Sequence, residues 1–237
     1  MRILVVGSCG KKKLNQSTIS PTCEDLASVN DIKTWREKSV PPPTRVRDLY
    51  TGNQNRELVH GVDLLRQIEK TEVMLSIISA GFGLVAEQDT LPTYECSFSG
   101  MKKSQILKRA KLLGIPSDFG ELITSGYDLV YLALGKKYFL TLGDEWKSKS
   151  STTIIGFDSS LSEEQMLCIP SAHEIVSSFS QNSHKIHGVT GFKGDLLRIL
   201  ANHALNQENS YRELLAWTHP VYFRDLVMKL GNLKIWH

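Results

Sequence analysis

The feature that most constrains the fold of this chain is the run of residues 2–7, which is apolar and rich in β-branched side chains. It ends in a turn that contains glycine, and such a run is typical of a buried strand. Similar runs recur at 73–79, 127–134 and 152–157, with segments of helical spacing between them. Because strands that alternate with helices form parallel sheets, the sequence predicts an α/β fold with a mostly parallel central sheet flanked by helices. The first strand is expected at its centre.

The spacing of apolar residues also locates helices. It predicts a crossover helix over 55–70 and a helix pair over 99–125, broken at 114–116. Residues 39–47 contain three consecutive prolines and should form a loop. Later helices are expected at 172–179, 194–206 and 211–230, the last one broken at Pro220.

The domain organisation follows from what the chain lacks. No internal repeat and no linker-like composition interrupts it. We therefore expect a single domain, 1–237, with a motif-bearing core of about residues 1–160 and a helical C-terminal cap of about residues 161–237.

Composition sets the class of protein and its compartment. The chain has 237 residues, 41% of them hydrophobic, which is enough apolar material for a sizeable core. Its four cysteines contain no C-x-x-C pair, so neither a zinc site nor a disulfide framework is expected, and the thiols should be reduced. No 18-residue apolar run occurs and the N-terminal run is too short for a signal peptide. We expect a cytoplasmic protein with no membrane partner.

The basic residues form three groups along a chain whose formal net charge is +3. Such a bias permits an anionic partner without requiring one. If the groups converge on one face they favour a polyanion; otherwise they are separate solvated patches. The groups are Lys11, Lys12 and Lys13; Lys33, Arg36, Lys38, Arg45 and Arg47; and Lys102, Lys103, Lys108, Arg109 and Lys111.

The loop of residues 7–13 is the first candidate site. It follows the first strand, and open α/β sheets bind ligands at the carboxyl ends of their strands. Its glycines allow close approach to a ligand, and the neighbouring ammonium groups would stabilise a thiolate at Cys9. The loop matches neither the Walker A pattern nor the G-x-G-x-x-G fingerprint. Cys9 is thus a candidate nucleophile; the alternative is a small buried cysteine followed by surface lysines.

Several short motifs, taken in order, resemble the YaaA-like family, and most of all its DpdC branch. They are the Ser-Cys-Gly-Lys-Lys-Lys loop, Arg47-Asp48-Leu49-Tyr50-Thr51-Gly52, Ser79-Ala80-Gly81-Phe82-Gly83-Leu84-Val85, Pro92-x-Tyr94 and Leu134-Gly135-Lys136-Lys137-Tyr138. The resemblance covers residues 1–145 or so and extends to the carboxyl-terminal part of archaeosine synthase. Where that enzyme has a proline before its cysteine, this chain has Ser8.

The resemblance implies a DNA-modification enzyme that acts on a 7-deazaguanine base in DNA. Its partners would be DNA carrying the modified guanine and other proteins of a DNA-modification pathway. The expected reaction is hydration of the nitrile of 7-cyano-7-deazaguanine to the amide, with Cys9 forming a thioimidate. Two other hypotheses stay open: a non-enzymatic YaaA-like DNA-binding stress protein with a structural Cys9, and a small-molecule enzyme whose loop holds a nucleotide phosphate.

Roles for the remaining residues follow from that chemistry. Glu87 and Asp89 are the expected acid–base carboxylates, and Lys11 or Lys12 should protonate the nitrile nitrogen or hold a phosphate. An extruded base needs polar contacts and stacking partners. The expected substrate-binding residues are Ser8, Gly10, Lys13, Arg47, Asp48, Tyr50, Ser79, Phe82 and Tyr94.

The histidines give little support for a metal. His173 should lie at the start of a helix, where a capping or core role competes with a role in a site. His184 and His187 have no third ligand nearby in the sequence. We therefore expect no metal and no cofactor.

Overall fold

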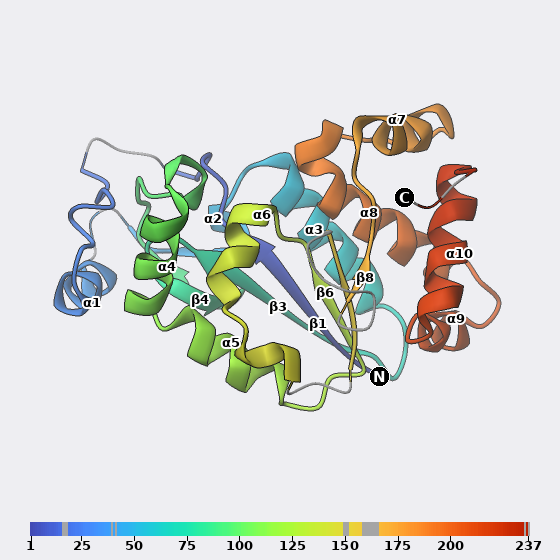
Figure 1. The fold of residues 1–237 in the computed structure, drawn as a ribbon, viewed down its shortest axis with the longest axis horizontal. Coiled ribbons are helices and arrows are strands. Elements are labelled where there is room, and N and C mark those ends of the chain that lie inside the picture. Colours follow the sequence, from blue (N-terminus) through green and yellow to red (C-terminus); the bar gives the residue numbers. More distant parts are fainter. Residues whose placement is uncertain are drawn as a thin grey trace.

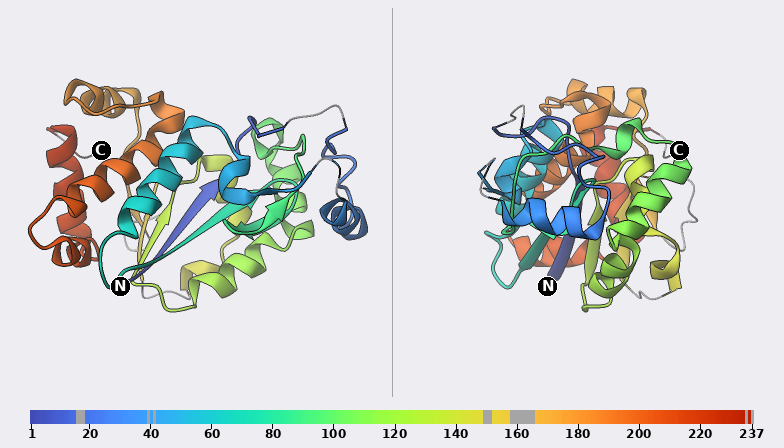
Figure 2. Two further views of the ribbon diagram at one scale, coloured as in Figure 1. Left: turned by 180° about the vertical axis from the view of Figure 1, so that it is seen from behind. Right: turned by 90° about the vertical axis from the view of Figure 1, so that its left-hand side faces the viewer.

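A computed structural model describes residues 1–15, 19–38, 40, 42–148, 152–157, 166–234 and 236. Its centre is a six-stranded sheet in the order β4-β3-β1-β6-β7-β8, with helices on both faces (Figures 1 and 2). All pairings are parallel except β3 with β4. The predicted α/β fold with a mostly parallel central sheet is confirmed, and helices form the C-terminal part.

The first strand lies at the centre of the sheet, as predicted. It pairs with β3 on one side and β6 on the other, and Ile3, Leu4, Val5 and Val6 are fully buried. A strand covered on both faces needs this continuous apolar run. The strands are β1 Arg2–Ser8, β3 Glu72–Ser79, β4 Gly83–Ala86, β6 Leu129–Leu132, β7 Thr153–Gly156 and β8 Leu167–Cys168, with β2 Thr44–Arg45 and β5 Thr90–Leu91 in a separate pair.

Most predicted helices are present. Gly114, with φ of 68°, separates α4 from α5, and Pro220 begins α10. The predicted 39–47 loop contains β2 and the start of α2; residues 39 and 41 lie outside the described part. The helices are α1 Val29–Glu37, α2 Val46–Leu49, α3 Asn53–Leu65, α4 Lys103–Leu112, α5 Ile115–Ile123, α6 Lys136–Phe139, α7 His173–Gln181, α8 Gly188–Leu205, α9 Ser210–Ala216 and α10 Pro220–Gly231, with 3-10 turns η1 Phe98–Gly100, η2 Leu140–Leu142 and η3 Glu145–Ser148.

Two glycines bring α3 and α8 into close contact. A Cβ at Gly61 would lie 2.9 Å from the backbone nitrogen of Arg198, and one at Gly194 would collide with the carbonyl oxygen of Gln54. Gln54 contacts Gly194 and, further along both helices, Gly61 contacts Arg198, so α3 and α8 run in the same direction. The two helices lie side by side in Figure 2. Both helices therefore begin near the same edge of the molecule, where the strands end.

A disulfide corrects one expectation from the sequence. Cys23 and Cys96 are bonded across 73 residues, with their Cα atoms 4.8 Å apart. The prediction of reduced thiols and no disulfide is therefore wrong for this pair. A backbone bridge between Thr22 and Glu95 aligns the two segments, and cysteine spacing alone does not reveal such a long-range pairing. Cys9 stays outside the disulfide.

None of the described helices combines the length and the apolar character needed to cross a bilayer.

Candidate active site

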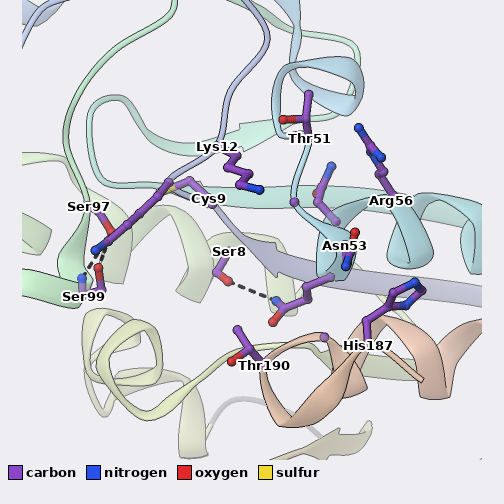
Figure 3. Close-up of a pocket in the computed structure, with 16 residues that line it drawn as sticks. Ser8, Cys9, Lys12, Thr51, Asn53, Arg56, Ser97, Ser99, His187 and Thr190 are labelled. Carbon is purple, nitrogen blue, oxygen red and sulfur yellow. Dashed lines mark hydrogen bonds between the residues drawn. The ribbon is translucent and has the colours of Figure 1, made fainter. Parts of the chain in front are cut away.

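A cavity of about 610 Å³ opens where β1 ends (Figure 3). Because β1 pairs with β3 on one side and β6 on the other, this is the point where the sheet reverses its winding, which is where α/β proteins bind ligands. Four segments form the wall: the loop after β1, the start of α3, the region of η1 and the start of α8. The lining residues are Ser8, Cys9, Gly10, Lys11, Lys12, Thr51, Gly52, Asn53, Gln54, Asn55, Arg56, Ser97, Ser99, His187, Thr190 and Gly191.

Cys9 lies on this wall and is held in place by its backbone and its sulfur. Its N–H donates to the carbonyl oxygen of Ile78 at 3.0 Å, and its Sγ accepts from the N–H of Ala80 at 3.4 Å. The side chain of Cys9 is 4% exposed. The thiol is thus fixed between β1 and β3 at the edge of the cavity.

Tyr138, on α6, is the nearest polar partner of the thiol. Its hydroxyl lies 3.0 Å from the Cys9 Sγ and donates to the Cys9 carbonyl oxygen at 2.8 Å. Burial raises the pKa of Tyr138, and the adjacent Cys9 raises it further, so the phenol keeps its proton. That single proton can be directed to the carbonyl oxygen or to the sulfur. The sequence motif that ends at Tyr138 predicts no role for the phenol.

The charges on the cavity wall are basic. Lys11, Lys12 and Arg56 line it, and no carboxylate is among the described lining residues. Gly52 precedes α3 without a side-chain cap, so the first amides of that helix are not capped from this position. Uncapped helix N-termini and cations both attract anions. The cavity therefore suits an anionic ligand.

Lys13 lies outside the cavity lining, contrary to the prediction that it binds substrate. It is 6% exposed, and its ammonium is 4.2 Å from the centroid of the Tyr94 ring. Burial lowers the pKa of Lys13, while Cys9 and Glu95 partly offset this effect. A backbone bridge to Tyr50 fixes this part of the loop. Lys13 is thus a buried positive charge near Cys9.

The aromatic residues predicted to stack on a base are in the core instead. Tyr50 is 1% exposed, Tyr94 is inaccessible and Phe82 is 5% exposed. The Tyr94 hydroxyl is 2.9 Å from that of Tyr50 and 2.7 Å from the Oγ of Ser79. Since Ser79 Oγ also accepts the N–H groups of Gly81 and Phe82, its own proton is directed to Tyr94. All four residues are buried in the core and none is among the lining residues, so the predicted stacking on a base is corrected.

Four predicted polar residues also lie outside the cavity lining. Glu87 pairs with Arg47 at 3.3 Å and with Arg66, so its charge is neutralised at the sheet edge. Asp89 accepts the N–H of Ala86 at 3.0 Å within a turn. Neither carboxylate is placed for the predicted acid–base role.

The other two predicted contacts to the base edge are likewise engaged elsewhere. Arg47 also binds Asp63 at 2.9 Å, and Asp48 pairs with Arg45 at 3.3 Å. Since both side chains are in surface or edge ion pairs, the predicted reading of the base edge by Arg47 and Asp48 is corrected.

The third basic group divides into two kinds of residue. Arg109 is buried; its guanidinium donates to the carbonyl oxygens of Ala80 and Cys23, and burial lowers its pKa. The prediction that it belongs, with its neighbours, to a charged face directed to solvent or to a polyanion is therefore corrected. The remaining members are exposed: Lys102, Lys103, Lys108 and Lys111.

His187 is a lining residue that sequence reasoning did not assign. Its Nδ1 lies 2.7 Å from Asp195 Oδ1, and its backbone N–H donates to Asp195 Oδ2 at 2.8 Å. Asp195 is fully buried. The recognisable signal was a histidine before the first turn of a helix with an aspartate two turns further on.

The surroundings of His187 also contain the most metal-like group among the described residues. Ligand atoms of Glu57, His187 and Asp195 all lie within 4.8 Å of one another. The structure thus supplies the additional ligand types that the sequence did not place near His187. However, Asp195 already binds the histidine, and Glu57 pairs with Arg198. Both carboxylates therefore already have partners within the protein.

The other two histidines of interest lie away from the cavity lining. His184 Nε2 is 3.1 Å from the carbonyl oxygen of Leu230, and His173 Nδ1 is 3.3 Å from Ser177 Oγ. Both therefore have local structural contacts.

No protein-family model matches the chain, and no curated protein matches it.

Proposed function

We propose that the protein is an enzyme that modifies a base in DNA, hydrating the nitrile of 7-cyano-7-deazaguanine to the amide. The observation that carries this proposal is the Cys9 thiol on the wall of a cavity of about 610 Å³ whose charged lining is basic. A cavity of this size accommodates a nucleotide-sized ligand. The choice of a nitrile comes from the resemblance of the sequence motifs, and a thiolate is a good nucleophile toward a nitrile carbon.

The reaction divides into an addition and a hydrolysis. In the addition, the sulfur of Cys9 bonds to the nitrile carbon while one proton reaches the nitrile nitrogen, giving a thioimidate. Water then adds to that carbon, the carbon–sulfur bond breaks and the thiol of Cys9 is restored as the amide forms. The net change is the addition of one water, and no redox partner or cofactor is consumed.

Each nearby group has a role in this scheme. The buried ammonium of Lys13 stabilises the thiolate, and the Tyr138 phenol turns its proton toward the sulfur as charge develops. Because the pKa of Tyr138 is raised, the phenol orients the sulfur without giving up its proton. Lys11 or Lys12, on the cavity wall, supplies the proton for the nitrile nitrogen.

The polymer is favoured over the free base by the position of α4. This helix begins shortly after Ser99, which lines the cavity, and carries no acidic residue. We expect its exposed lysines to contact phosphates of the strand, and such contacts supply affinity without reading sequence.

One observation favours the alternative of a DNA-binding protein without catalysis. Cys9 is only 4% exposed and makes four hydrogen-bonding contacts through its sulfur and backbone, as a structural cysteine would. The two functions differ in whether the modified base changes chemically.

Initial rates on four substrates test the proposal: modified plasmid, modified oligonucleotide, the nucleoside and the free base, each at low and moderate salt. Mass analysis of the digested products detects the added water. We expect efficient conversion of plasmid and oligonucleotide, with salt raising KM much more than it lowers kcat. Equal efficiency on free base and plasmid, without a salt effect, would indicate an enzyme of small-molecule metabolism. DNA binding without conversion would favour the DNA-binding protein without catalysis.

A further inference from the structure

The end of the cavity formed by α3 and α8 has no role in the chemistry at Cys9. Figure 3 shows Cys9, Ser97 and Ser99 on one side and Arg56, Asn53 and His187 on the other. The cavity is therefore longer than the reacting group needs, and its second end requires its own ligand contacts.

His187 is built into this end with a fixed orientation. Both oxygens of the fully buried Asp195 accept from the same residue, one from the backbone N–H and one from Nδ1. A carboxylate can only accept, so Nδ1 carries a proton and Nε2 is the ring nitrogen left for a ligand. A Cβ at Gly191 would lie 2.7 Å from the Cβ of His187, so only glycine leaves room for this arrangement.

The charges around the ring distinguish this end from a cation site. Asp195 is shielded from solvent, and Glu57, 3.8 Å from Nδ1, is neutralised by Arg198. Neither carboxylate lines the cavity, whereas Arg56 does. The α3–α8 contact also places the beginnings of both helices here, which adds favourable dipoles for an anion.

We propose that Arg56 and His187 form a subsite for the phosphate of a nucleotide whose base lies at Cys9. The phosphate accepts from the guanidinium of Arg56 and, once His187 carries a second proton on Nε2, from that ring nitrogen, while Asp195 positions the ring through Nδ1. This inference rests on the proposed function for the identity of the base. It defines the substrate class as a phosphate-bearing nucleotide unit within a strand.

Calorimetric titration with two unmodified probes tests the subsite without turnover. The probes are dGMP and deoxyguanosine, which share base and sugar and differ in the phosphate. In the wild-type protein dGMP should bind about tenfold or more tightly than deoxyguanosine, because a hydrogen bond to a charged group contributes that much. His187→Gln and Arg56→Gln should each bring this ratio toward one.

His184→Gln is the matched control, because that histidine contacts Leu230 instead of the cavity. Circular dichroism of each variant verifies the fold, and Cys9→Ser should retain the dGMP preference. An unchanged ratio in His187→Gln, or no phosphate preference in the wild type, would overturn the subsite. Retention of the ratio with no hydration of modified DNA would instead reject the proposed function alone.

Discussion

At the scale of single residues, the surroundings of the Cys9 thiol include side chains that could not be predicted from the loop sequence. Three lysines in a row are equivalent in sequence, but the backbone bridge at Lys13 turns that side chain inward. Likewise, the tyrosine 129 residues away from Cys9 reaches it only because α6 follows β6, the strand beside β1. The loop position was therefore predictable, whereas the groups that complete the site required the sheet order.

Tyr138→Phe tests the contact with the sulfur. The variant keeps the ring that packs edge-on against Phe98 and removes the hydroxyl that reaches Cys9. We expect a stability loss of about 0.5–1.5 kcal/mol, the contribution of one hydrogen bond. Hydration should slow about tenfold or more with little change in KM. Unchanged kcat would remove Tyr138 from the mechanism.

Lys13→Met tests the buried ammonium. Burial lowers the pKa of Lys13 below its ordinary value of 10.5, so the unfolded chain holds this proton more tightly than the folded one. The free energy of unfolding should therefore rise with pH as the lowered value is passed and level off near 10.5. In Lys13→Met this rise should disappear and hydration should fall. Denaturant unfolding across that pH range measures the effect, and an identical pH dependence in both proteins would contradict it.

At the scale of helices and strands, the deeply buried elements could be predicted from the sequence and the exposed or very short ones could not. The continuous apolar strands β1, β3 and β6 were predicted because both faces of each are covered. Helix α1 was missed because its apolar stripe is only three residues long, Val29, Ile32 and Trp35, and none of its residues is fully buried. The Ser28–Asp31 capping box marks its start. The short edge strands β4 and β8 carry too few residues to show a period.

The disulfide connects the segment before α1 to the segment that leads into η1. Because Cys96 directly precedes Ser97 on the cavity wall, this bond anchors one side of the site. Cys23→Ser should lower the free energy of unfolding by about 2–4 kcal/mol, because the disulfide closes a long loop in the unfolded chain. Cys168→Ser serves as the control, and unfolding in denaturant with and without reductant makes the comparison. Equal stability in both variants would show that the bond contributes nothing.

Helix α4 carries both a buried arginine, Arg109, and exposed lysines, and the two kinds of residue should respond differently to substitution. Neutralising Lys103, Lys108 and Lys111 should weaken DNA binding similarly for all sequences and reduce the salt slope by about one for each phosphate that a lysine no longer neutralises. Arg109→Met should instead destabilise the fold by about 2–4 kcal/mol, because its guanidinium binds buried carbonyl groups. Binding isotherms at several salt concentrations decide the first effect. An unchanged slope would make the lysines ordinary solvated surface.

At the scale of the whole molecule, the site is assembled from segments distant in sequence. The α/β class and the strand end that carries Cys9 follow from hydrophobic patterning. The far wall, with Arg56 and His187, depends on the close glycine contact between α3 and α8. Patterning predicts each of these helices separately but not their pairing, because a glycine contact leaves no periodic signal.

The central claim is that the Cys9 thiol attacks the modified base, and Cys9→Ala tests it most directly. Alanine fits the small buried position and removes only the sulfur. Purified wild-type and variant proteins are incubated with DNA containing 7-cyano-7-deazaguanine, and the digested nucleosides are analysed by mass. We predict conversion of the nitrile to the amide by the wild type and none by Cys9→Ala, with DNA binding and folding retained. Full conversion by the variant, or no conversion by the wild type, would contradict the account.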